Sequence, residues 1–120
     1  TEILKDIDCI YIPSLPENIR HAWYKFYVYL KPNLLSSGWN RERIVAEIND
    51  REYPCFTGSC GEIYLEKSIQ KLGFEPKKDL INAKKLSKTS LMFCVHPTIS
   101  SEQMIRYAEI IKKVLINSSK

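Results

Sequence analysis

The chain has 120 residues, 44% of them hydrophobic and 27% charged, with a formal net charge of +4. This length fits a single domain with one packed core. No apolar run approaches the roughly 20 residues of a membrane span, and the first residues do not have the pattern of a signal peptide. The mild basicity is not joined by an aromatic or Arg-rich motif, so we expect no nucleic-acid partner and no membrane partner. Four cysteines in an adequate core indicate reduced thiols and a cytoplasmic location.

Residues 1–20 are predicted to be a linker. Pro13, Pro16 and Asn18 interrupt every helical period there, and we expect only a short extended piece, at residues 9–12. The chain has no initiator methionine, so we expect it to have been cut from a longer one.

Residues 22–30 predict a β-strand, because aromatic and β-branched residues dominate them. Alternation gives the strand a core face and an amphipathic second face, formed respectively by Tyr24, Phe26, Val28 and Leu30 and by Trp23, Lys25, Tyr27 and Tyr29. The aromatic residues of the second face would pack either against a partner or under helices of this same domain.

The middle of the chain predicts a helix over residues 40–51, capped by Asn40, and a short strand over residues 54–57. A second helix follows, with Gly73 in the left-handed position after its end. A third helix is expected to start at Asp79. The apolar stripes of the second and third helices consist of Ile63, Leu65, Ile69 and Leu72, and of Leu80, Ala83 and Leu86.

An unbroken apolar run at residues 89–95 predicts a central strand covered on both faces. A last helix begins with a capping box formed by Ser100 and Gln103 and extends to Leu115, and residues 117–120 are expected to be frayed. The order β-α-β-α-α-β-α predicts an α/β domain of the α+β type. We expect a small open sheet of about three strands with helices packed mainly on one face.

A loop of small residues before the second helix is the best candidate to face a ligand. It consists of Thr57, Gly58, Ser59 and Cys60, followed by Gly61. Backbone N–H groups at such a helix start can face an anion, and a tight turn that requires glycine explains the same residues.

The sequence predicts neither a metal site nor a thiol nucleophile. Cys55, Cys60, Cys94 and His96 are spaced more widely than the ligands of a structural zinc site, so no metal is predicted. A thiol nucleophile would need Cys55 or Cys60 beside His21 or His96, and sequence alone does not bring them together.

Five segments together resemble a known family. Residues 21–28, 41–48, 54–67, 89–98 and 100–115 are similar, in order and spacing, to the C-terminal small domain of the DegT/DnrJ/EryC1/StrS family. The resemblance covers nearly the whole chain and defines a domain over residues 21–116.

This resemblance implies the small domain of a fold-type I enzyme that uses pyridoxal phosphate (PLP). Most members transfer an amino group to a nucleotide-linked keto-sugar, a few remove a hydroxyl group, and they work as homodimers. The Schiff-base lysine and the other cofactor ligands lie in a large domain that would precede Thr1. We therefore expect no catalytic or cofactor-binding residue in this chain, which would be non-catalytic by itself. Its parent enzyme would serve surface-polysaccharide biosynthesis of the lipopolysaccharide or O-antigen type.

One departure from the family concerns the candidate loop. Many members have a His-Tyr pair there, whereas this chain has Thr57, Gly58, Ser59 and Cys60. Only the location of the loop, near the mouth of the sugar site, is carried over. The alternatives are a stand-alone α+β interaction or regulatory module that binds a small anion at residues 58–61, and a thiol enzyme.

Overall fold

A computed structural model describes residues 1–120, and one antiparallel sheet is its centre. The four strands are β1 (Ile10–Tyr11), β2 (Lys25–Leu30), β3 (Cys55–Phe56) and β4 (Ser90–Cys94), in the order β1-β2-β4-β3. The apolar strand β4 has a neighbour on each side, which confirms its central position. The α+β class and the open sheet are likewise confirmed, with β1 added to the three expected strands.

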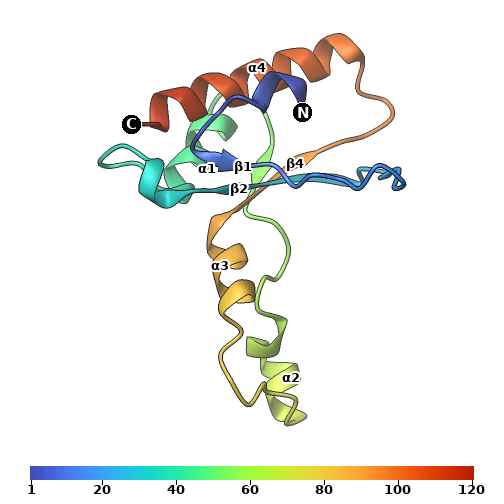
Figure 1. Cartoon of the computed structure of the whole chain (residues 1–120), viewed down its shortest axis with the longest axis vertical. Coiled ribbons are helices and arrows are strands. Elements are labelled where there is room, and N and C mark those ends of the chain that lie inside the picture. Colours follow the sequence, from blue (N-terminus) through green and yellow to red (C-terminus); the bar gives the residue numbers. More distant parts are fainter.

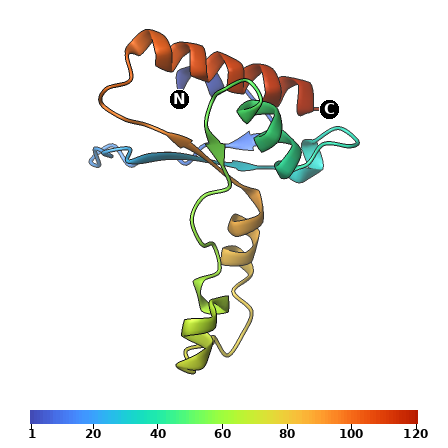
Figure 2. The ribbon, with the colours of Figure 1, turned by 180° about the vertical axis from the view of Figure 1, so that it is seen from behind.

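Helices cover one face of this sheet. α1 (Arg41–Asn49), α4 (Ser101–Ser118) and the 3-10 helix η1 (Glu2–Leu4) lie together on that side, with both chain termini (Figures 1 and 2). A further 3-10 helix, η2 (Pro32–Leu34), follows β2. No helix has both the length and the apolarity that a membrane span requires. The buried core between sheet and helices is built chiefly from Val28, Leu30, Ile44, Ile48, Leu91, Phe93, Tyr107, Ile111, Val114 and Leu115.

Both predicted helix caps are confirmed, whereas the helix expected from Asp79 begins at Ile81. The Asn40 side chain accepts a 2.8 Å hydrogen bond from the Arg43 N–H at the start of α1. At the start of α4, Ser100 accepts from the Gln103 N–H and the Gln103 side chain accepts from the Ser100 N–H, completing the capping box. These bonds satisfy N–H groups that have no partner inside the helix.

The first predicted strand is shorter than its sequence pattern suggests. β2 starts at Lys25 because Trp23 has a φ of +49°, which interrupts the extended backbone. Alternation therefore holds only from Lys25 onward: Val28 and Leu30 are buried, whereas Tyr24 is 80% exposed. The Trp23 ring packs against Phe26, with 5.1 Å between ring centroids, and not beside Tyr27 as alternation predicts.

The segment expected as a linker, residues 1–20, packs onto the body in its first half. Leu4, Ile7 and Ile10 are buried, and this apolar spacing lies before the first proline. The extended piece expected near Cys9 is confirmed as β1, and the Lys31 N–H donates to the Cys9 carbonyl at 2.8 Å. The prolines that predicted a linker begin only at Pro13, and burial of the apolar side chains before it orders the first half of the segment.

The tail is also held, in contrast to the fraying expected at residues 117–120. Ser118 is fully buried, and its carbonyl accepts from the Ser36 N–H at 2.8 Å. Ser119 pairs with Leu35 in an isolated bridge and its carbonyl accepts from the Ser36 hydroxyl at 2.6 Å. Backbone pairing that is remote in sequence gives this tail an order that its polar composition does not indicate.

Residues 57–89 form an arm that projects from the other face of the sheet (Figure 1). It contains the 3-10 helix η3 (Ile63–Leu65), α2 (Lys67–Lys71) and α3 (Ile81–Thr89). The prediction of one continuous second helix is wrong. Extended backbone at Glu66, with ψ of 133°, divides it into η3 and α2. The left-handed conformation of Gly73 is confirmed by its φ of +71°. The apolar stripes do not reach the core, and the arm exposes Ile63, Leu65, Leu72, Phe74, Leu80, Ile81 and Leu86.

Candidate functional site

A groove of about 450 Å³ lies where the arm meets the sheet. One wall is the sheet face opposite α1 and α4, the second is the candidate loop, and the third is α3. The lining residues, by wall, are Tyr27, Tyr29 and Ser90; Ser59, Cys60 and Gly61; and Ala83, Leu86 and Ser87.

The candidate loop is held against the sheet at two points. The Ser90 hydroxyl donates to the Thr57 carbonyl at 2.6 Å. Gly58 has a φ of +100°, and a Cβ placed on it would lie 2.8 Å from Cε1 of Tyr27. A tight turn that requires glycine is therefore confirmed at Gly58. Of the four residues predicted to face a ligand, the structure places Ser59 and Cys60 at the groove, while Thr57 and Gly58 anchor the loop.

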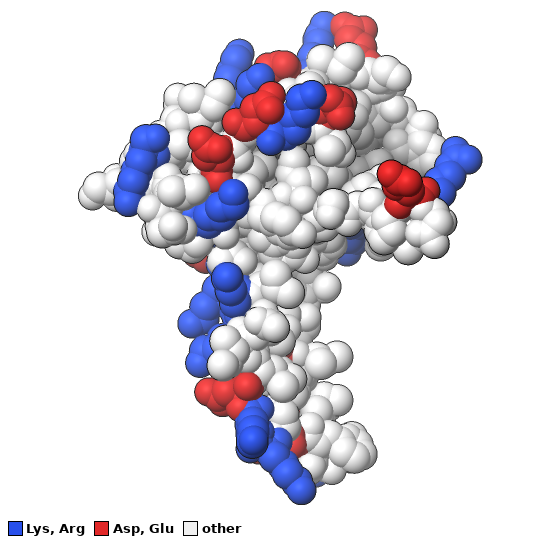
Figure 3. Space-filling model, viewed as in Figure 1, with Lys and Arg blue, Asp and Glu red and all other residues white.

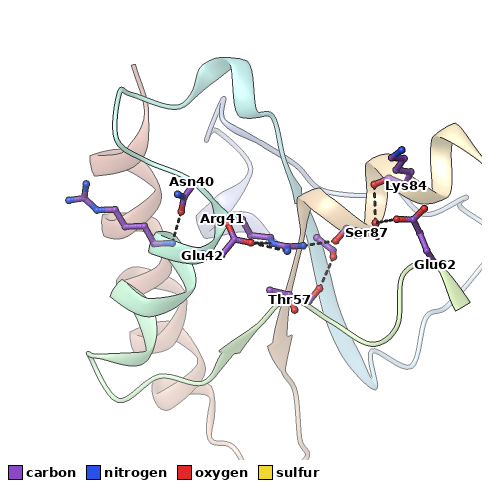
Figure 4. Close-up of polar contacts among 9 residues, drawn as sticks. Asn40, Arg41, Glu42, Thr57, Glu62, Lys84 and Ser87 are labelled. Carbon is purple, nitrogen blue, oxygen red and sulfur yellow. Dashed lines mark hydrogen bonds and ion pairs between the residues drawn. The ribbon is translucent and has the colours of Figure 1, made fainter. Parts of the chain in front are cut away.

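Within the arm, a small polar network connects the candidate loop to η3 and α3 (Figure 4). The Glu62 carboxylate accepts from the Tyr64 hydroxyl at 2.6 Å and makes a longer contact, of 3.3 Å, with the Ser87 hydroxyl. The hydrogen bond to Glu62 raises the pKa of Tyr64 to about 12, since the protonated phenol is the form that donates. This network fixes the loop, the start of η3 and the end of α3 relative to one another.

The anion-binding alternative depended on a helix that starts after the loop. The structure has there only the three-residue 3-10 helix η3. Such a short element does not present the converging N–H groups and the dipole of an α-helix start.

The four cysteines do not form an activated thiol site. The Cys60 thiol donates to Glu66 at 3.2 Å, and this hydrogen bond raises the pKa of Cys60. Burial raises the pKa of Cys55 to about 12. Neither histidine supports a thiol: His21 accepts from the Trp23 N–H, and His96 bonds with Thr98. No three His, Cys, Asp or Glu side chains gather closely enough to hold a metal ion.

Replacing Glu66 by glutamine is expected to speed alkylation of Cys60. Removing the carboxylate lowers the pKa of Cys60, so a larger fraction is thiolate at a pH of about 8, and the thiolate is the reactive form. Iodoacetamide labelling followed by peptide mass spectrometry would measure the rate. Glu75→Gln, another charge removal on the arm, should leave the rate unchanged, and Cys55 provides a buried internal reference. Equal Cys60 rates in the two variants would contradict this assignment.

The groove combines aromatic faces with hydroxyl groups and has no acid, base or lysine on its walls. These side chains offer stacking and neutral hydrogen bonds, the interactions that a polar, uncharged group can accept. Sequence reasoning had indicated Tyr27 and Tyr29 as an amphipathic face. Nothing in the sequence indicated that Ser87 and Ser90 belong to the site, because only the fold brings them to the loop.

The chain is similar to parts of known aminotransferases. It is 41% identical to an aminotransferase from Psychrobacter cryohalolentis, with a TM-score of 0.82 over 91% of this chain and 29% of that one. A DegT DnrJ EryC1 StrS aminotransferase from Brucella abortus is 19% identical, with a TM-score of 0.73 over 93% of this chain and 27% of that chain. The GDP-4-keto-6-deoxy-D-mannose-3-dehydratase of E. coli is also 19% identical, with a TM-score of 0.71 over 92% of this chain and 27% of that enzyme.

No protein-family model matches the chain, and no curated protein sequence matches it. The chain spans less than a third of the length of each solved structure described above. Its sheet, its helices and this share of the length all correspond to one domain of a fold-type I enzyme. In sequence and in fold, the chain thus resembles the C-terminal small domain of the DegT/DnrJ/EryC1/StrS aminotransferases, as its motifs indicated.

Proposed function

We propose that this chain is the C-terminal small domain of a PLP-dependent aminotransferase that acts on a nucleotide-linked keto-sugar. The observation that carries the proposal is the 41% identity to an aminotransferase over 91% of this chain but only 29% of the relative. The remaining length of such a relative has room for the large domain that supplies the catalytic centre. The amino acceptor, the surface-polysaccharide role, the cytoplasmic location and the homodimer of the parent enzyme are parts of the same proposal.

The cofactor would be held outside this chain. PLP chemistry requires a lysine amine, a carboxylate at the ring nitrogen and a cradle for the phosphate. No lysine and no carboxylate lines the groove, and no lysine lines the apolar pocket beside η1. The residues that line these two cavities therefore do not fit the cofactor. Support for PLP in the parent comes from the E. coli dehydratase, which contains bound hydrated PLP.

The exposed apolar side chains of the arm indicate that it contacts another domain. The arm exposes large apolar side chains on both η3 and α3, and Phe74, which follows α2, is 70% exposed. Residues 57–89 also include seven lysines and only four acidic residues, and basic side chains line the arm in Figure 3. Exposed apolar side chains with charged neighbours are typical of a contact site when they form a patch. In this proposal the arm contacts a large domain, and the groove at its base faces the substrate.

The test is cofactor binding by the chain alone and by its complete reading frame. The isolated chain mixed with PLP is expected to give no imine absorbance near about 420 nm, because it has no fitted lysine site. The complete protein, with some 250 further residues by analogy with a domain of typical size, is expected to show that band and to lose it on reduction with borohydride. An imine band in the isolated chain, stable to dialysis, would refute the proposal, as would a complete frame that begins near Thr1.

A further inference from the structure

Arg41 joins the body of the domain to the arm. It is the first residue of α1, and its Nη1 donates to the Ser87 carbonyl at 2.5 Å, 46 positions along the chain (Figure 4). Ser87 lies in the last turn of α3, where helix carbonyls have no intrahelical partner. A cation at this end of a helix also complements the helix dipole. The contact therefore satisfies a group that the arm by itself leaves open.

The guanidinium of Arg41 is held in one orientation. Its Nε and Nη2 both donate to Oε1 of Glu42, at 3.0 and 2.9 Å. The Arg41 side chain is only 20% exposed, in contrast to 68% for Glu42. A planar guanidinium that is fixed on one edge presents its remaining donor in a defined direction. Arg41 therefore acts as a rigid connection rather than as a mobile surface charge.

Ser87 in turn determines where the candidate loop lies. A Cβ on Gly61 would lie 2.2 Å from Cβ of Ser87, so the two backbones are as close as a missing side chain permits. The Ser87 hydroxyl donates to the Lys84 carbonyl at 2.9 Å and makes a longer contact, of 3.3 Å, with the Glu62 carboxylate. Both Gly61 and Ser87 line the groove, and Tyr27 lines it from the sheet. A displacement of Ser87 therefore changes the separation between loop, helix and sheet.

We infer that Arg41 is a positioning residue that sets the shape of the groove at the base of the arm. By holding the Ser87 carbonyl, it fixes the last turn of α3 against the body and, through Gly61, the loop. The inference rests on the proposed function only in treating this groove as the substrate side. The geometric claim concerns this chain alone, without cofactor or substrate.

The test compares Arg41→Ala with Arg43→Ala in ¹⁵N-labelled protein. Arg43 is on the same helix, but it donates to Gly38 and stacks on Trp39, and none of these residues belongs to the arm. In Arg41→Ala we expect the residual dipolar couplings of the sheet and of α4 to agree with the wild-type structure. The couplings of the α3 amides should no longer agree with it, because α3 has changed its orientation. Amide shifts at Ser59 and Gly61 should change in the same variant. In Arg43→Ala, α3 and the loop should keep their wild-type couplings and shifts.

A third variant separates positioning from general stabilisation. Arg41→Lys keeps a positive donor near the Ser87 carbonyl and is expected to restore most of the α3 couplings. A residue that only stabilises the fold would change the unfolding midpoint without reorienting α3. Wild-type α3 couplings in Arg41→Ala would overturn the inference, and so would a departure that Arg41→Lys does not reduce. Failure of the complete protein to bind PLP would contradict the proposed function and would leave these couplings unaffected.

Discussion

Replacing Leu115 by alanine is expected to lower the free energy of unfolding by about 2–5 kcal/mol. Leu115 is fully buried on α4 and belongs to the core cluster between helices and sheet. Truncation removes buried apolar contact and leaves a cavity that a close-packed core fills only partly. Urea unfolding followed by circular dichroism would measure the change, with an unaltered slope against denaturant as the sign of an intact two-state transition.

The neighbouring residue provides the control for this prediction. Ile116 is on the same helix and is 54% exposed. Ile116→Ala removes a side chain of similar volume without opening a cavity, so the stability should change by no more than about 0.5 kcal/mol. Equal losses in the two variants would mean that α4 does not present the face described above to the core.

The second large effect is expected for Gly61→Ala, which should cost about 1–3 kcal/mol. The added Cβ would lie 2.2 Å from Cβ and 2.8 Å from Cα of Ser87, so the backbone of α3 or the loop must move. Because Ser87 also contacts Glu62, the shift should spread to η3. Thermal unfolding would measure the stability, and amide shifts at Ser87 and Glu62 would show where the structure moves.

Gly73→Ala separates crowding from backbone strain in the same arm. A Cβ at Gly73 meets nothing within 4 Å, but its φ of +71° disfavours any side chain. That variant should cost about 1 kcal/mol, through strain alone, and should leave the amide shifts of Ser87 in place. If Gly61→Ala also left Ser87 unshifted, the close approach of loop and helix described here would be wrong.

Elements whose signals are local could be predicted from the sequence. The capping box at Ser100 and Gln103, the Asn40 cap and the apolar run of β4 each specify their structure within a few residues. The fold class followed from their order. The start of β2 was missed because the left-handed Trp23 has no compositional sign. The ordered ends were missed because their partners, such as Ser36 for Ser118, are remote in sequence.

The arm shows a different limit of sequence reasoning. Helical spacing of Ile63, Leu65 and Leu72 indicates apolar faces that must be buried, yet the structure leaves all three exposed. Periodicity reports which side chains avoid water and does not report which surface covers them. For the candidate site, the loop could be located from its small residues. The other walls could not, because Tyr27 and Ser87 meet the loop only through the fold.

The junction between the arm and the sheet is asymmetric. α3 ends at Thr89 and β4 begins at Ser90, so the helix continues into the central strand without a single intervening residue. On the other side, residues 57–62 separate β3 from η3, and they include Gly58 and Gly61. Any reorientation of α3 relative to the sheet must therefore change the backbone torsions at Thr89 and Ser90, because no loop residue lies between helix and strand. The orientation of α3 is thereby coupled to β4, which pairs with both β2 and β3.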